Sequence, residues 1–481
     1  MKRICLICLA SILLISLISM SCDSVATPPA APMGLTCKWV SSSQIDLSWD
    51  ASSGATGYHI YRCAGASCTP TAMVHNQSTT SWSDIGLTSN TTYRYRLTAY
   101  NEAGESSYSS IVSCTTYNPE AVWNKTFGGS GDDWGVSVQQ TSDGGYVIAG
   151  RTFSYGAGAS DAWLLKTNSL GNMAWNQTFG GSGNDTANSV QQTSDGGYII
   201  TGQTDSYGAG GWDIWLLKTN SSGNMAWNQT FGGSGNDYGY SVQQTADGGY
   251  VIAGITNSCG AGGYDVWLIK IDPSGNETWN RTFGGSDYDS CNSVQQTSDG
   301  GYIIAGYTDS FGAGGWDVWL IKIDPSGNEA WNQTFGGSGE DWALSVQQTS
   351  DGGYIIAGTT VFSGAGGWDI WLIKADSSGS EIWNQTFDGL DDDYGASVQQ
   401  TSDGGYVIVG TSNFHGAGKA DVWLIRTDSS GNEIWNQTFD GLDDDYGASV
   451  QQTSDGGYIV LGDAESYGAG GWDVWLIKVT A

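Results

Sequence analysis

The chain has 481 residues, a length that suggests two or three domains. Its 23 tryptophans are too many for a disordered low-complexity protein. Acidic residues number 49 against 17 basic ones, so the formal net charge is −32, and we expect no nucleic-acid partner because phosphate would be repelled. Only three histidines (His59, His75 and His415) are available for histidine-based catalysis or metal binding.

Residues 1–21 predict a secretory signal peptide, since a short basic start leads into an apolar stretch over residues 4–20. The segment resembles a lipoprotein signal, which implies a lipid on Cys22. Ser19 stands where that family usually has Leu, and Ser19 and Ser21 also satisfy the ordinary small-x-small cleavage rule. A secreted protein with an unmodified Cys22 therefore stays open. In both cases we expect an extracytoplasmic protein that meets a membrane only through a lipid anchor.

Residues 22–33 are rich in proline and predict an extended tether. Residues 34–117 then alternate apolar and polar side chains in short runs, such as Ile45-x-Leu47-x-Trp49, which predicts a small antiparallel sandwich. Trp49 at the end of one run and Leu87-x5-Tyr93 as a tyrosine corner resemble a fibronectin type III domain. That resemblance implies a spacer or an adhesion module.

Four cysteines of this segment are expected to form disulfides in an oxidising compartment. Cys63 and Cys68 flank a short loop. Cys37 lies in the first predicted strand and Cys114 in the last, so their pairing would join the two ends of the domain. The alternative is four free thiols.

From residue 121 the chain is a repeat with a period of 52 residues. Every repeat contains Ser-Val-Gln-Gln-Thr, Asp-Gly-Gly-Tyr, Gly-Ala-Gly and Asp-x-Trp-Leu. Each opens with Trp-Asn-x-Thr-Phe, at Trp123, Trp175, Trp227, Trp279, Trp331, Trp383 and Trp435. The Asn-x-Thr segments are also glycosylation sequons, which matter only in a host with that machinery.

One repeat predicts four strands, at residues 242–245, 250–255, 266–271 and 278–283. Four-stranded sheets that are apolar on both faces and stack on like neighbours are typical of propeller blades. The last repeat lacks a fourth strand, and residues 121–127 supply one that belongs to no earlier repeat. We therefore predict an all-β chain in which residues 121–481 form a seven-bladed β-propeller closed by its N-terminal outer strand.

The repeats resemble those of bacterial and archaeal surface propellers in the quinoprotein-like (PQQ-like) group. The sequence contains no residue set that would hold a quinone, so no cofactor is expected. The three arginines of residues 121–481, Arg151, Arg281 and Arg426, are not expected to converge as a sialidase-like site would need. With no catalytic triad or nucleophile-elbow motif, an enzyme is the least favoured interpretation.

Long loops are predicted on one face only, and two residue types recur there. The aromatic candidates for ligand binding are Trp212, Tyr264, Trp316, Trp368 and Trp472; the equivalent positions of the other two repeats hold Ser160 and Ala420. Planar rings suit sugar faces or protein anchors. Packing between adjacent loops is the alternative.

Clustered carboxylates on the same face could hold Ca²⁺ through oxygen ligands, and the candidates are Asp391, Asp393, Asp443 and Asp445. Turn capping is the alternative. Asp161 and its six equivalents are expected to satisfy backbone groups. Cys259 and Cys291 each depart from their repeat column, and we predict a disulfide between them.

Near-identical repeats offer the same surface several times, which suits binding more than catalysis. Residues 381–406 are identical to residues 433–458. We therefore expect a non-enzymatic cell-surface binding or adhesion protein for glycan or protein ligands. A structural envelope protein without a dedicated ligand is the second interpretation.

Overall fold

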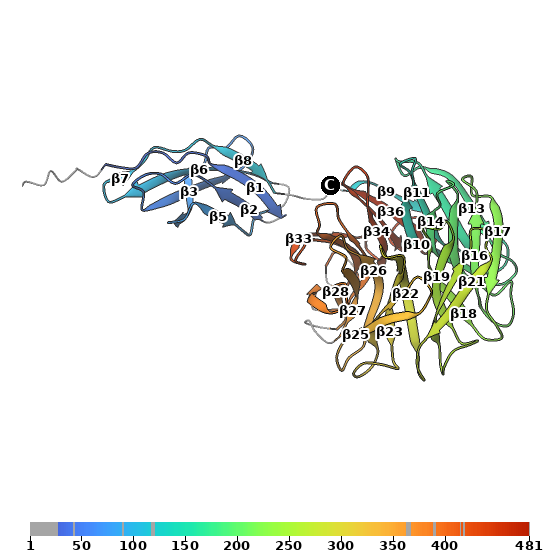
Figure 1. The fold of residues 1–481 in the computed structure, drawn as a ribbon. Helices are drawn as coiled ribbons and strands as arrows, with labels where there is room; N and C mark the ends of the chain where they lie inside the picture. The colour runs from blue at the N-terminus through green and yellow to red at the C-terminus, as the bar shows by residue number, and fades with distance from the viewer. Residues whose placement is uncertain are drawn as a thin grey trace, which may run out of the picture. The chain divides into compact units, whose positions relative to one another are not determined.

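The computed structural model describes residues 27–41, 44–88, 91–116, 121–361, 367–387, 391–413, 415–416 and 419–480 (Figure 1). The expected signal peptide and Cys22 lie outside the described residues. The chain divides into two units, Met1–Tyr117 and Asn118–Ala481, and every regular element of the described part is a β-strand. No helix there is long and apolar enough to cross a membrane.

The first unit is a sandwich of two antiparallel sheets, ordered β1-β2-β5 and β4-β3-β6-β7, with β8 paired to β6. The strands are β1 (Thr36–Ser41), β2 (Gln44–Ser48), β3 (Gly57–Ala64), β4 (Ala72–Gln77), β5 (Ser81–Asp84), β6 (Thr92–Asn101), β7 (Gly104–Glu105) and β8 (Val112–Thr115). Inward side chains of both sheets form one core in which Trp49 meets Tyr58 edge-on at 5.4 Å. The hydroxyl of Tyr93 accepts a 3.0 Å bond from the backbone N–H of Thr88, so the predicted tyrosine corner is present.

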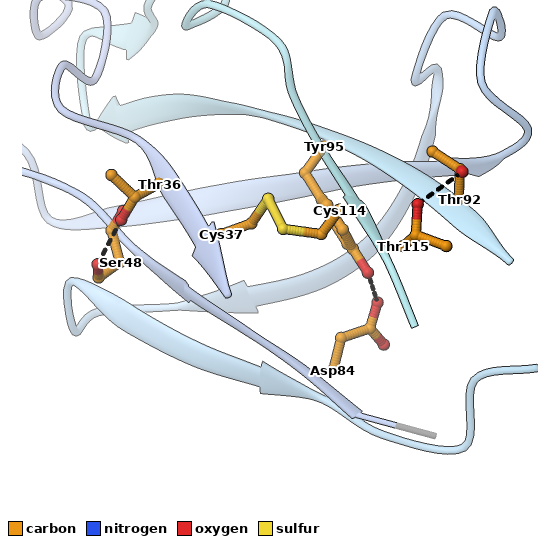
Figure 2. Close-up of a disulfide and its surroundings, with 8 residues drawn as sticks. All are labelled: Thr36, Cys37, Ser48, Asp84, Thr92, Tyr95, Cys114 and Thr115. Carbon is orange, nitrogen blue, oxygen red and sulfur yellow. Dashed lines mark hydrogen bonds between the residues drawn. A yellow bond between two sulfur atoms is a disulfide. The ribbon is translucent and has the colours of Figure 1, made fainter. Parts of the chain in front are cut away.

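Both predicted disulfides of this unit are formed. Cys37 pairs with Cys114 and Cys63 with Cys68. Figure 2 shows the first of them beside Tyr95, whose hydroxyl donates a 2.8 Å bond to the buried Asp84. The Cys37–Cys114 bond joins the first strand to the last across 77 residues of sequence and so restricts the unfolded chain.

The second unit contains seven four-stranded antiparallel sheets, one for each repeat. The first strands are β10 (Asp133–Gln140), β14 (Asp185–Gln192), β18 (Asp237–Gln244), β22 (Asp289–Gln296), β26 (Asp341–Gln348), β30 (Asp393–Gln400) and β34 (Asp445–Gln452). The second strands are β11 (Tyr146–Thr152), β15 (Tyr198–Thr204), β19 (Tyr250–Thr256), β23 (Tyr302–Thr308), β27 (Tyr354–Thr360), β31 (Tyr406–Ser412) and β35 (Tyr458–Ala464).

The third strands, buried along their whole length, are β12 (Asp161–Thr167), β16 (Asp213–Thr219), β20 (Asp265–Ile271), β24 (Asp317–Ile323), β28 (Asp369–Ala375), β32 (Asp421–Thr427) and β36 (Asp473–Val479). The fourth strands are β13 (Met173–Phe179), β17 (Met225–Phe231), β21 (Glu277–Phe283), β25 (Glu329–Phe335), β29 (Glu381–Phe387) and β33 (Glu433–Phe439). The seventh sheet takes its fourth strand from elsewhere in the chain.

That strand is β9 (Ala121–Phe127), which pairs antiparallel with β36 in the register Val474 to Phe127. The predicted pairing of the N-terminal strand with the last repeat is therefore confirmed. Phe127 packs into the core between the first and last sheets, where it is 7% exposed.

Each sheet contacts the next through its second strand, as β11 does with β14, and the last does so with the first through β35 and β10. The first strands of all seven sheets line one shared cavity. Every sheet has two edges, and none in the described part closes on itself.

The first strands are longer than predicted. Residues 242–244 of the strand expected at 242–245 belong to β18, which begins at Asp237 and ends at Gln244. Its register shifts between Gly239 and Ser241, so a bulge interrupts the alternation that the sequence pattern relied on. The same shift occurs in all seven sheets.

The Ser-Val-Gln-Gln motif caps the free edges of the first strands. Ser189 Oγ accepts the N–H of Val242 at 3.3 Å, and Gln191 Oε1 accepts the N–H of Gln244 at 2.6 Å, both on the next sheet. The contact from last sheet to first is equivalent, with Gln451 Oε1 accepting the N–H of Gln140 at 2.6 Å. Edge N–H groups that no strand pairs are thereby satisfied.

The tight turns between first and second strands lie at the end of the unit that we call the short-turn end. In the turn after β18, Asp247 Oδ1 accepts bonds from Thr245, the Gly249 N–H and the buried Lys270. Partial burial acts to raise the pKa of Asp247, but these bonds outweigh it and lower the pKa to about 2.

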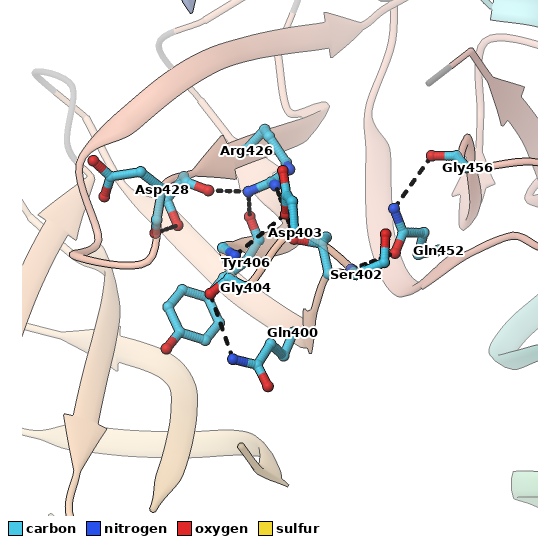
Figure 3. Close-up of polar contacts among 12 residues, drawn as sticks. Gln400, Ser402, Asp403, Gly404, Tyr406, Arg426, Asp428, Gln452 and Gly456 are labelled. Atoms are coloured by element: carbon cyan, nitrogen blue, oxygen red, sulfur yellow. Dashed lines mark hydrogen bonds and ion pairs between the residues drawn. The ribbon is translucent and has the colours of Figure 1, made fainter. Parts of the chain in front are cut away.

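Six sheets place a lysine at this turn, and the sixth sheet places Arg426 there. Figure 3 shows Arg426 bonded to Asp403, with the neighbouring Gln400 and Gln452 amides bound to turn backbones. Arg426 also donates to the carbonyl of Tyr406 at 3.1 Å. Every sheet therefore has one acid–base pair at this end.

Candidate functional site

The opposite end of the second unit, the long-loop end, is built from two kinds of connection. One leads from second to third strand, such as residues 205–212, and the other leads into the next sheet, such as residues 232–236. Gly210 has a φ of 103°, and a Cβ there would lie 2.6 Å from the carbonyl oxygen of Gly233. Only glycine allows the two loops to approach this closely.

The carbonyl of Trp212 accepts a 2.6 Å bond from the N–H of Asp237, the first residue of the next sheet. Equivalent bonds are accepted by the carbonyls of Tyr264, Trp316, Trp368 and Trp472, and also by those of Ser160 and Ala420, which lack a ring. The backbone carbonyl at this position joins its sheet to the next one in all seven cases, whereas the aromatic ring is present in only five. The side chain is therefore dispensable to this contact.

The aromatic side chains of the long-loop end form an aromatic belt, with ring centroids 4.5–6.3 Å apart along two arcs. The long arc consists of Trp212, Tyr238, Tyr264, Tyr288, Tyr307, Trp316, Trp342, Trp368 and Tyr394. The short arc consists of Trp134, Trp472 and Tyr446. All five predicted aromatic residues belong to the belt, and all five are half-buried.

The rings contact one another more than sequence reasoning expected. Trp472 lies between Trp134, at 4.9 Å, and Tyr446, at 5.0 Å, with both neighbours stacked. Trp368 lies 4.5 Å from Trp342 and 6.3 Å from Tyr394. The stacked neighbours of Trp472 therefore cover part of its ring faces, whereas most other rings of the belt meet at a tilt.

Sequence reasoning missed seven members of the belt: Trp134, Tyr238, Tyr288, Tyr307, Trp342, Tyr394 and Tyr446. Five of them occupy the second residue of a first strand, where the other two sheets have Thr186 and Ser290. These residues could have been found from the sequence, because the position directly after the Asp that opens each first strand is aromatic in five of the seven repeats. It was missed because the first strands were predicted to begin after it.

One polar group of this end occurs in a single sheet. Asp463 lies on β35 and accepts a 2.6 Å bond from the Gly135 N–H. Burial raises the pKa of Asp463 to about 8, although Gly135 and the nearby Arg151 act to lower it. Arg151 itself lies over the ring of Trp134 at 5.3 Å. The repeat pattern predicted that the first and last sheets meet, but not this contact, because Asp463 departs from its repeat column.

Buried carboxylates form a second feature of the long-loop end, with a pair at each junction between sheets. One Asp opens a third strand and the other opens the first strand of the next sheet; at the last junction they are Asp473 and Asp133. A Cβ on Gly128 would lie 1.6 Å from Asp473 Oδ1 and 2.9 Å from Asp133 Oδ2, so the two carboxylates share one small space. None of the fourteen aspartates is more than 3% exposed.

These aspartates hold backbone and hydroxyl groups in place. Asp473 accepts the Ala469 N–H at 2.7 Å, as was expected for the third-strand column. Asp133 accepts bonds from the Gly129 N–H and from Ser154. Burial raises the pKa of Asp473, and the negative charge of Asp133 raises it further. The bond from the Ala469 N–H acts to lower it.

The four aspartates predicted as calcium ligands are not brought together. Asp393 and Asp445 are buried and open two different sheets, whereas Asp391 and Asp443 are exposed on the loops before them. Within the described ranges, no three His, Cys, Asp or Glu side chains are arranged to hold a metal ion. Asp393 and Asp445 open two different sheets, so the structure gives the four predicted calcium ligands no common site.

The predicted Cys259–Cys291 disulfide is wrong, because both thiols are free. Cys291 is fully buried between two sheets and donates a 3.0 Å bond to the carbonyl of Gly254. Cys259 is exposed in its loop. The position of Cys291 takes only small side chains elsewhere in the repeats because it faces the neighbouring sheet, and burial raises the pKa of its thiol.

Comparisons with known proteins concern mainly the first unit. The family model "Fibronectin type III domain" matches residues 30–115. The chain is 29% identical to Exoglucanase B of Cellulomonas fimi over 32% of this chain and 15% of that protein. It is 33% identical to Chitinase Chi52 of Paenibacillus xylanexedens over 24% of this chain and 21% of that protein. The chain thus spans about a fifth or less of these relatives.

Among solved structures, the one titled "Structure of FN3tt mut" is 26% identical and covers 19% of this chain and 100% of its own, with a TM-score of 0.18. The predicted features of the first unit are present in the structure, namely two packed sheets, the core Trp49 and the Tyr93 corner. Together with the family match, they show that residues 30–115 are a fibronectin type III domain.

Proposed function

We propose that this protein is a non-enzymatic binding protein of the cell surface, in which the long-loop end of the second unit presents the aromatic belt to neutral glycans. The main support for this proposal is the belt itself, in which twelve aromatic rings lie together at one end of the unit. Rings of this kind contribute large, rigid contact areas. We further propose adhesion as the role of this binding.

The scaffold for this role is a seven-bladed β-propeller, with the seven sheets as its blades and β9 as the closing strand. Three observations support it. Sheets contact in sequence order, β35 of the last sheet contacts β10 of the first, and Ser454 N–H donates to Gln140 Oε1 at 2.8 Å as its equivalents do between other sheets. The resemblance to quinoprotein-like propellers extends to the fold alone, and we propose no quinone cofactor.

The choice of a neutral glycan rests on charge and on the relatives. The long-loop end carries the fourteen buried aspartates and exposed loop acids such as Asp391 and Asp443, whereas each Asp-Gly turn of the short-turn end pairs its carboxylate with a lysine or an arginine. Such an end disfavours anionic ligands. Two relatives are an exoglucanase and a chitinase, so fibronectin type III domains like this one accompany polysaccharide-active proteins.

We propose an extracytoplasmic location, with a lipid on Cys22 as anchor or with secretion after cleavage. The two disulfides of the first unit support it, because such bonds persist in oxidising compartments. No catalytic role is proposed, since the isolated polar groups Arg151, Arg281 and Arg426 contact an aromatic ring or a turn in three different sheets.

Pull-down of the full chain by insoluble cellulose, chitin, xylan and starch tests this function. The variant Trp316→Ala/Trp368→Ala removes two rings of the long arc, and we expect at least about a fivefold loss of binding, since two stacked ring contacts contribute about 1–3 kcal/mol beyond their buried area. The control Trp331→Ala/Trp383→Ala removes two rings of the outer strands and should retain binding.

Two results would overturn the proposal. If no polysaccharide or glycan array retains the wild-type chain, the glycan assignment fails and a structural envelope role gains support. If the belt variant unfolds below the control variant's melting temperature, the rings are packing elements and the contact surface lies elsewhere.

A further inference from the structure

A cavity of about 230 Å³ lies where the first strands of all seven sheets meet. Two side chains from each sheet line it, a valine and the first glutamine of the Ser-Val-Gln-Gln motif. The glutamines are Gln139, Gln191, Gln243, Gln295, Gln347 and Gln399, with Gln451 as the seventh. No predicted site residue lies here, and the proposed glycan surface does not include it.

The orientation of these seven amides is fixed by chemistry. Each Oε1 accepts a backbone N–H of the next sheet at 2.5–2.6 Å, as Gln243 does from Gln296. A backbone N–H can bond only to the amide oxygen, so the usual ambiguity between oxygen and nitrogen does not arise. The NH₂ group must then occupy the remaining position.

No bond from these seven NH₂ groups to another protein group is present in the described part of the chain, although the second glutamines do bond through theirs, as Gln296 does to the Gly300 carbonyl. Seven side chains that line one cavity therefore keep two N–H donors each, and their carbonyl oxygens are already bound to the wall. The free amide N–H groups therefore place a ring of partial positive charge around the cavity.

The charge around this ring permits an anion despite the acidity of the whole chain. Every Asp-Gly turn between first and second strands pairs its carboxylate with a basic side chain, as Asp247 pairs with Lys270 at 2.9 Å. The paired buried carboxylates open the first and third strands, at the other end of each sheet. Further acids such as Asp272 and Glu277 lie on the turn before the fourth strand and at its start, and neither lines the cavity.

We infer that this cavity, lined by the first strands of all seven sheets, is a binding site for one small oxyanion. The anion would be a sulfate, a phosphate or a carboxylate, held by N–H bonds from the ring of glutamines. Charge-assisted N–H bonds to such oxygens are stronger than neutral ones. The cavity has room for a four-oxygen anion with several waters, which allows a bond from only some of the seven amides at one time.

Isothermal titration calorimetry of the full chain with sodium sulfate, sodium phosphate and sodium acetate, at constant ionic strength, tests this site and distinguishes the three anions. We expect one anion per chain with a dissociation constant at or below the millimolar range for at least one salt. Sodium chloride, as the reference, should give no such isotherm.

The variant Gln243→Glu/Gln347→Glu keeps an oxygen for the two backbone N–H groups but replaces two donors by negative charges. We expect affinity to fall at least tenfold. The matched control Gln244→Glu/Gln348→Glu makes the same charge change at the second motif glutamine, outside the cavity lining, and should retain at least half the wild-type affinity.

The inference is overturned if the wild-type chain binds none of the three anions at millimolar concentration, a result that needs no variant. It is also overturned if the Gln243→Glu/Gln347→Glu chain binds as tightly as wild type. Equal losses in both double variants would overturn it as well, because they would mean a general effect of added negative charge. Polysaccharide binding is unaffected in each case, so this test is independent of the proposed function.

Discussion

Removal of β9 tests how the second unit is held together. A chain that begins at residue 121 retains the strand, and one that begins at residue 128 lacks it. The loss exposes the edge of β36 and removes Phe127, which is 7% exposed in the core between the first and last sheets. It also removes Trp123, whose ring lies 5.9 Å from that of Tyr146.

The magnitude follows from these contacts. Truncating a buried Phe costs about 3–5 kcal/mol, and each lost ladder bond adds about 1 kcal/mol. We therefore expect the free energy of unfolding to fall by at least about 5 kcal/mol. At roughly 2 °C per kcal/mol for a domain of this size, the melting temperature should drop by about 10 °C or more.

Differential scanning calorimetry of the two chains measures this difference. A synthetic peptide of residues 121–127, added to the shorter chain, should recover part of the lost stability by adding a strand to the open edge. Melting temperatures within about 2 °C of each other would refute the reasoning, because the last sheet would then be stable with three strands.

Further predictions concern the thiols, the short turns and pH. Alkylation of the native protein should modify Cys259, and Cys291 should react only after denaturation, as peptide mapping can show. Asp247→Ala should cost about 3 kcal/mol in chemical denaturation, because it leaves Lys270 buried without its partner, whereas Lys270→Met should cost less than half of that. The pKa of Asp421 is raised to about 7 by burial and by neighbouring carboxylates, so its contribution to stability is complete below the pKa of the unfolded chain and is lost as pH rises through 7. Thermal melts should accordingly show higher stability at pH 5.5 than at pH 8.5, with a smaller difference in Asp421→Asn.

Local patterns predicted the elements that depend on local chemistry. Residues that repeat at a fixed interval predicted the Asp-Gly-Gly turns and the buried third strands. They also predicted that β9 pairs with the last sheet. The tyrosine corner and both disulfides of the first unit followed from the resemblance and from the spacing.

Contacts between sheets were not predictable in the same way. Cys259 and Cys291 come from adjacent sheets, and one residue of register decides whether a side chain points into the core or toward the loops. The bulge after Gly239 shifts that register within each first strand. The caps formed by Ser and Gln were missed because their partners lie 53 residues away, on the next sheet.

Hydrogen–deuterium exchange of the full chain, with and without the polysaccharide fragment that binds it best, locates the binding surface directly. The proposed function predicts slower exchange in the long loops, such as residues 257–264 and 309–316, and unchanged exchange in the short turns, such as residues 245–249. Protection confined to the short turns, or to the fibronectin type III domain, would contradict the assignment of the aromatic belt as the binding surface.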